Sequence, residues 1–146
     1  KIKPTERLCG ISWRTTNQNF ASRNLQLKSL VASLAAPGLR FVSLQYGDTQ
    51  NEMDTVAAEL GIRVLSCEEV DNFRDMDGLA ALIAACDVVV SIDNTTVHLA
   101  GALGKPVNVL LPFDSDWRWM TLVTGVIGTL QPGFSGKVLI GTGCRF

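Results

Sequence analysis

A polar turn that could help to bind an anion directly follows one of the most apolar runs of the chain. The β-branched run Val88 to Ile92 is followed by five polar residues: Asp93, Asn94, Thr95, Thr96 and His98. Side-chain oxygens of Asn and Thr accept from the free N–H groups of a starting helix, so a helix is predicted to begin near Thr95 or Thr96. Its free amides and positive dipole end suit a phosphate, to which His98 could donate. A packed or capping histidine, with Asp93 as a brace for the turn, explains the same residues equally well.

Two other predicted turns carry residues of the same kind. Arg14 follows the apolar segment 8–13, where its planar guanidinium could clamp an anion, although a solvated loop arginine is the commoner case. Tyr46 and Asp48 follow segment 40–45 and could contact a base or a ribose, although Gly47-Asp48 is also typical of a simple turn. The sequence contains no Gly-rich phosphate loop, no nucleophile elbow and no multi-histidine metal site. It therefore indicates a phosphate-binding edge without a complete catalytic set.

Strands and helices alternate along the predicted chain. Strands are expected at 8–13, 40–45, 62–65, 88–92 and 107–111, and helices at 25–34, 51–60, 78–85 and 95–103. Asn24 or Ser22 is expected to cap the first helix and Asp77 the third, while Gly104 ends the fourth. This order predicts an α/β fold with a doubly wound parallel sheet. The turns after the first, second and fourth strands then meet at the carboxyl edge, where open α/β sheets bind ligands.

The composition is typical of a single domain with a hydrophobic core, and the charge gives no sign of an anionic partner. The chain has 146 residues, of which 47% are hydrophobic and 18% charged, and a net charge of -1, so nothing indicates nucleic acid or an anionic membrane surface. No secretory signal is apparent at Lys1, and no apolar run approaches the ~20 residues that span a bilayer. A cytoplasmic protein is expected. Four distant cysteines without a C-x-x-C pair are predicted to be buried thiols: Cys9, Cys67, Cys86 and Cys144.

Three segments together resemble a known family. They are ISWR near the start, FVSLQYGD in the middle, and the long block DVVVSIDNTTVHLAGALGKPVNVLLPFDSDWRW. From about residue 8 to 120 the chain resembles the C-terminal half of heptosyltransferase-like glycosyltransferases (glycosyltransferase family 9-like), especially the bacterial versions fused to tetratricopeptide repeats. The resemblance implies one half of a GT-B fold, in which two Rossmann-like domains face each other and the C-terminal one holds most of the nucleotide sugar.

The family's Asp-Thr-Gly-x-x-His motif, which contacts the donor diphosphate, falls on Asp93, Asn94, Thr95 and His98. Asn94 and Thr95 depart from the Thr and Gly of that motif. The basic residue after the first strand would be Arg14, and the acidic turn on the nucleoside side would be 46–48. The segment 116–118 matches the stretch after the fifth strand without an assigned role.

The resemblance implies the donor-binding domain of an inverting glycosyltransferase of the hexosyl- or heptosyl-transfer class. The donor would be a nucleoside-diphosphate sugar, with no metal and no other cofactor. The acceptor domain and its catalytic base belong to the other half of the family's fold, so no catalytic residue is expected here, and the chain alone should bind nucleotide but transfer little. Two alternatives remain open: a non-catalytic or degenerate Rossmann-like module for binding or assembly, and a sugar-nucleotide epimerase that takes its carboxylates from another domain.

Residues 121–146 do not continue the resemblance. They are rich in glycine and have no helical periodicity. Synonymous codons from Met120 onward, read two bases later, encode a peptide with Trp-Tyr-Pro and Arg-Leu-Phe-Arg-Gln segments, which is similar to the family's continuation. We hypothesise that a domain at 1–120 is followed by a frameshifted tail at 121–146. Such a tail was never selected to pack here, so its segment 138–140 could pair with an edge strand or with another chain, giving a homo-oligomer.

Sequencing the encoding DNA tests this hypothesis. We expect codons after Met120 that spell the family-like continuation in the shifted frame. Codons that cannot encode that peptide would end the frameshift hypothesis.

Overall fold

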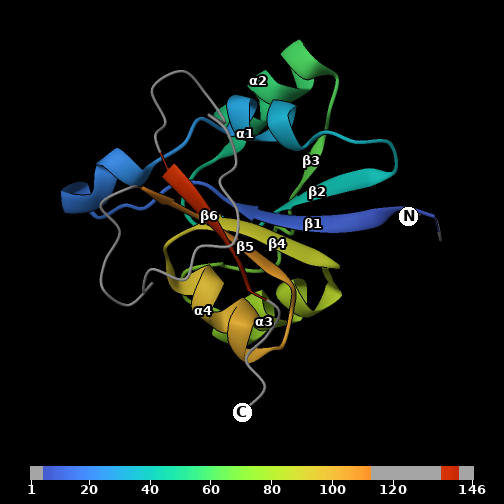
Figure 1. Ribbon diagram of the computed structural model, residues 1–146. Helices are drawn as coiled ribbons and strands as arrows, with labels where there is room; N and C mark the ends of the chain where they lie inside the picture. The colour runs from blue at the N-terminus through green and yellow to red at the C-terminus, as the bar shows by residue number, and fades with distance from the viewer. Residues whose placement is uncertain (1–4, 113–135, 142–146) are drawn as a thin grey trace.

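A mostly parallel sheet with helices on both faces forms the protein (Figure 1). The structure, a computed structural model, describes residues 5–112 and 136–141. The strand order is β3-β2-β1-β4-β5-β6, in which β1 to β5 run parallel and β6 pairs antiparallel with β5. The elements in chain order are β1 (Arg7–Ser12), the 3-10 helix η1 (Gln18–Arg23), α1 (Leu27–Leu34), β2 (Leu39–Ser43), α2 (Gln50–Leu60), β3 (Val64–Leu65), α3 (Met76–Ala85), β4 (Val88–Ile92), α4 (Thr95–Ala102), β5 (Val107–Pro112) and β6 (Gly136–Gly141).

The direction in which strands are added reverses between β1 and β4. From β1 the chain adds β2 and β3 on one side, then returns to add β4 and β5 on the other. Helices α1 and α2 therefore cover one face and α3 and α4 the opposite face, as Figure 1 shows. At such a switch point the flanking helices diverge and leave a crevice at the carboxyl ends of the two strands. Here those ends meet at Ser12 and Ser91, which are register partners.

The strands are apolar because both of their faces are buried. On β1, Cys9 and Ile11 pack under α1 and α2, while Leu8 belongs to the cluster under α3 and α4. The α/β fold predicted from the sequence, a Rossmann-like doubly wound sheet, is confirmed, and so is the order of its elements. Burial also raises the pKa of the Cys9 thiol to about 12 and that of Cys86 to about 11, so the expectation of buried thiols is confirmed for these two.

Two predicted helix caps are wrong. Asp75, and not Asp77, caps α3, because its Oδ1 accepts from the Gly78 amide at 2.8 Å. Neither Asn24 nor Ser22 caps α1, whose N-cap is Gln26 without a side-chain bond. Asn24 is instead held two residues upstream of that cap by the loop after β1, where it exchanges two hydrogen bonds with the Thr15 backbone.

Strand β6 covers the outer edge of β5. Val138 is the register partner of Leu110, and Ile140 that of Asn108. This is the edge-strand pairing expected for residues 138–140. The rest of the predicted tail, residues 121–135 and 142–146, lies outside the described residues, as does segment 116–118, so the domain boundary at residue 120 stays a prediction.

Gly10 should tolerate no side chain, because a Cβ there would lie 2.5 Å from Leu44 Cδ1 and 3.0 Å from Cys86 Sγ. We expect Gly10→Ala to lower the free energy of unfolding by about 1–3 kcal/mol. Gly101 is the matched control: nothing lies within 4 Å of its added Cβ, so Gly101→Ala should raise stability by up to about 1 kcal/mol. Urea unfolding of both variants measures the difference. Equal stability of the two variants would contradict this account of the sheet.

Candidate functional site

Three loops meet at the carboxyl edge of the sheet because β2, β1 and β4 are neighbours. We call this region the polar edge and define it as residues 12–17, 43–49 and 91–98. It contains all eight residues predicted from the sequence to bind a ligand, in the loop after β1, the turn after β2 and the start of α4. Their convergence on one edge is thus as expected, while their binding role stays a prediction.

Asn94 organises the start of α4. It is the N-cap, and its Oδ1 accepts from the Thr96 amide at 3.1 Å and from Ser91 Oγ at 3.1 Å. Its Nδ2 donates to Ser12 Oγ at 2.7 Å, which ties β4 to β1 across the switch point. The predicted helix start at Thr95 or Thr96 is confirmed. Thr96 is buried by this arrangement, whereas Thr95 is exposed.

His98 lies at the surface of the polar edge. Its side chain is 57% exposed, and its Nε2 lies 3.9 Å from Oδ1 of Asp93, whose own side chain is only 7% exposed. The imidazole is therefore not packed in the core. The two residues form a pair at the first turn of α4, with the carboxylate on the inner side and the imidazole outward.

Side-chain oxygens hold the loop after β1 at every step. Five consecutive backbone amides in this loop each donate to such an oxygen, and the geometry of the loop is therefore set without strand pairing. The donors and acceptors are Trp13 and Arg14 to Gln45 Oε1 at 3.0 Å, Thr15 to Asn24 Oδ1 at 2.7 Å, Thr16 to Tyr46 Oη at 3.2 Å, and Asn17 to Thr15 Oγ1 at 3.2 Å.

Arg14 reaches across the turn after β2. Its Nη2 donates to the Asp48 carbonyl, and its Nη1 lies 3.5 Å from Glu52 Oε2. The guanidinium Nε is buried and has no hydrogen-bond partner. The Asp48 carboxylate itself accepts from the Gln50 amide and so serves the turn. Arg14 and Asp48 are therefore brought together, on the α2 side of the polar edge.

Tyr46 sits between this loop and a surface hollow. Its ring packs against that of Phe73, with centroids 5.6 Å apart, and the hollow beside it measures about 320 Å³ at the carboxyl ends of β2 and β3. Partial burial alone would raise the pKa of the phenol. Hydrogen bonds from Thr16 and the charge of Arg14 outweigh that effect and lower the pKa below its usual value of 10.

Sequence reasoning missed the residues that hold the polar edge together. Gln45 and Ser12 are 3% and 0% exposed, and Ser12 Oγ donates to Gln45 Oε1 at 3.1 Å. Glu52 accepts from the Trp13 indole at 3.1 Å, and Asn72 donates to the Gln45 carbonyl at 3.1 Å. One sequence pattern could have pointed to Ser12 and Gln45, because each is a polar residue near the end of an apolar run.

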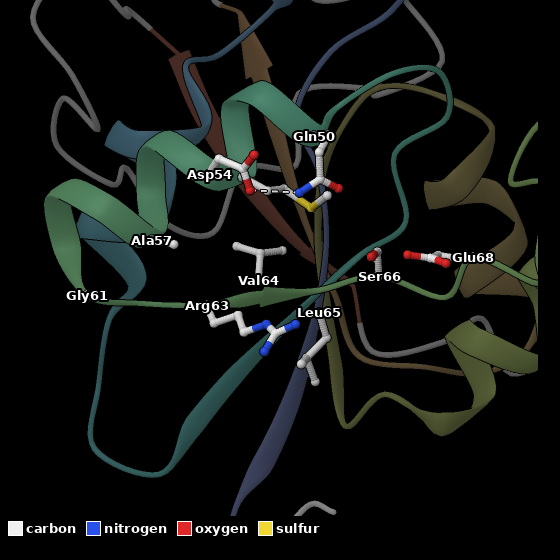
Figure 2. A pocket seen from close by; sticks show the side chains of 10 residues that line it. Gln50, Asp54, Ala57, Gly61, Arg63, Val64, Leu65, Ser66 and Glu68 are labelled. Carbon is white, nitrogen blue, oxygen red and sulfur yellow. Dashed lines mark hydrogen bonds between the residues drawn. The ribbon is translucent and has the colours of Figure 1, made fainter.

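A second hollow, of about 440 Å³, lies between α2 and the β3 segment (Figure 2). Helix α2 contributes Gln50 and Asp54 to it, joined by a 2.7 Å hydrogen bond, and the β3 segment contributes Arg63. It contains none of the predicted site residues. Within residues 5–112 and 136–141 no cluster of side chains could hold a metal ion, and no helix is long and apolar enough to cross a membrane.

The chain is similar in sequence to a known protein over most of its length. No protein-family model matches the chain. It is 38% identical over 120 residues to Protein FlbA of Caulobacter vibrioides, a match that covers 80% of this chain but only 20% of FlbA. The chain therefore spans about a fifth of the length of that relative.

Among solved structures, the chain is similar to E. coli heptosyltransferase WaaC with ADP, with a TM-score of 0.56 and 20% identity over 77% of this chain and 34% of WaaC. NodZ α-1,6-fucosyltransferase soaked with GDP-fucose matches with a TM-score of 0.47 and 15% identity, over 77% and 40% of the two chains. The similarity to WaaC shows a shared fold, and the predicted half of a GT-B fold is thereby confirmed.

The contacts of Tyr46 generate a pH prediction, because it is the only tyrosine of the chain. Phenolate absorbance should titrate with a midpoint below 10. In Arg14→Ala the midpoint should rise, because a nearby positive charge stabilises the phenolate. A lowered phenol pKa adds to the free energy of unfolding at pH values above 10, the usual phenol value, and this contribution is lost as the pH falls through the pKa of the folded protein. A midpoint at or above 10 in the wild type would contradict these contacts.

Proposed function

We propose that this chain is the donor-binding domain of a glycosyltransferase that uses a nucleoside-diphosphate sugar. The observation that carries the proposal is the convergence of the α4 N-terminus, His98 and the Arg14 loop on the switch point of the sheet. Open α/β sheets hold ligands at that point. The fold shared with heptosyltransferase WaaC, solved with ADP, supports the proposal.

The diphosphate would lie at the start of α4. The helix dipole is positive there, and the Asn94 cap takes only the Thr96 amide, which leaves the Thr95 amide and hydroxyl at the surface. His98, outward on the same turn, would donate to a phosphate oxygen, and Asp93 behind it would orient the ring. Fixed dipoles and charges would then stabilise the leaving nucleoside diphosphate without a metal.

The nucleoside would lie on the other side of the polar edge. The hollow there is lined by Tyr46, whose ring packs on Phe73, and by the carboxyl ends of two strands. The Arg14 side chain is 32% exposed and its Nη1 approaches Glu52 Oε2 at a long 3.5 Å, so its terminal nitrogens still have hydrogen-bonding capacity. A ribose or phosphate oxygen near Asp48 would use it.

The whole protein would contain further domains. This chain covers about a fifth of FlbA and a third of WaaC. We propose that an acceptor-binding domain with the catalytic base faces the polar edge, that tetratricopeptide repeats precede it, and that the protein works in the bacterial cytoplasm. This chain alone would then bind the donor without transferring the sugar.

A second candidate is a degenerate module that serves assembly and binds no nucleotide. The polar edge favours it in one respect, because its best donors already have partners within the chain: Arg14 faces Glu52, and the Thr96 amide faces Asn94. Calorimetric titration separates the two candidates, because the degenerate module gives no heat of binding with any nucleotide.

Thermal unfolding with ADP, GDP, UDP or CDP tests the leading proposal. At a ligand concentration of 100 Kd, the preferred nucleotide should stabilise the fold by about 2.7 kcal/mol. His98→Ala and Arg14→Ala should lose most of this stabilisation. The matched control is Arg63→Ala, which removes an exposed arginine at the other hollow and should leave nucleotide stabilisation unchanged. Equal stabilisation of wild type, His98→Ala and Arg14→Ala would refute the assigned site.

A further inference from the structure

A chain of hydrogen bonds crosses the polar edge from the N-cap of α4 to the loop before α3. Asn94 Nδ2 donates to Ser12 Oγ at 2.7 Å, and Ser12 Oγ donates to Gln45 Oε1 at 3.1 Å. The Gln45 carbonyl accepts from Asn72 Nδ2 at 3.1 Å. These four residues come from sequence positions far apart, and they connect the proposed diphosphate side to the hollow beside Tyr46.

Gln45 is the centre of this chain of bonds. It is 3% exposed, and its Oε1 accepts from three donors: Ser12 Oγ and the amides of Trp13 and Arg14. Its Nε2 donates to the Tyr46 carbonyl at 3.3 Å. These contacts fix the orientation of the side-chain amide, because a flipped amide would place its own N–H groups against the N–H donors of Trp13 and Arg14.

The bonds of Gln45 decide where Arg14 and Thr16 lie. Two successive amides anchored on one oxygen set the direction in which the loop leaves β1. From there the Arg14 guanidinium reaches Asp48 and Glu52, and the Thr16 amide reaches the Tyr46 hydroxyl. If Gln45 released the loop, the buried Trp13 amide and the half-buried Arg14 amide would each lose an acceptor, and other loop conformations would compete.

We propose that Gln45 is a positioning residue of the ligand site, which holds Arg14 and the Tyr46 hydroxyl in their binding geometry and links them to the α4 cap through Ser12. The expected effect of Gln45 on nucleotide affinity rests on the proposed function. Its expected effect on the geometry of the loop after β1 is independent of any ligand. In this role Gln45 acts through the loop and not by contact with a ligand, because its side chain is buried and bonded to the protein through both Oε1 and Nε2.

Gln45→Met tests the inference, since methionine has a similar shape but only a weak acceptor. We expect the Tyr46 titration midpoint to rise toward 10, because the phenol loses the Thr16 hydrogen bond and the nearby Arg14 charge. We expect affinity for the preferred nucleoside diphosphate, measured by calorimetry, to fall at least tenfold. Val56→Ala is the matched control: Val56 is fully buried on α2 and outside the polar edge, so the variant should lose stability but keep both readouts.

Each outcome decides the inference. A wild-type midpoint together with wild-type affinity in Gln45→Met would overturn it, as would equal changes in Val56→Ala. If wild type binds no nucleotide, the proposed function fails, and the Tyr46 midpoint alone then decides whether Gln45 positions the loop. If Gln45→Met does not fold, Asn72→Ala removes the bond to the Gln45 carbonyl from a half-buried loop; a smaller rise of the midpoint supports the inference, and no rise contradicts it.

Discussion

The reversal of strand order between β1 and β4 is the constraint on which the rest of the structure depends. Parallel strands with right-handed crossovers must send their helices to opposite faces on the two sides of that point. The carboxyl ends of β1 and β4 are consequently left without a helix above them. The buried polar groups at this place need hydrogen bonds of their own, and the Asn94–Ser12 contact supplies the one that crosses the gap.

The amides of the loop after β1 are held by side chains and not by backbone pairing. Gln45, Asn24 and Tyr46 each supply an oxygen to the loop after β1, in place of the carbonyls that a longer strand would offer. In such a fold, substitution of a few polar residues can change the site while the sheet stays the same. This separation of sheet and site fits the observation that one fold hosts many functions.

The sheet could be predicted from the sequence, whereas the hydrogen bonds within the site could not. The apolar run Val88 to Ile92 predicts a strand because such a strand is buried on both faces. Gly104 predicts the end of α4 because glycine adopts the left-handed conformation found there, with a φ of 68°. Capping was less predictable, because Asp75 and Asp77 are chemically equal, and which of them accepts from the Gly78 amide depends on the residue at which the helix begins. Gln45 could not be identified, because its partners Trp13 and Arg14 lie 31 to 32 positions away. Such pairings depend on which strands become neighbours, which local patterns do not encode.

The preformed loop after β1 has a kinetic consequence. Its amides are already bonded before any ligand arrives, so the entropy of ordering this segment is spent during folding and not during association. A ligand that uses Arg14 should therefore bind in a single fast phase, at a rate proportional to its concentration and without a slow rearrangement.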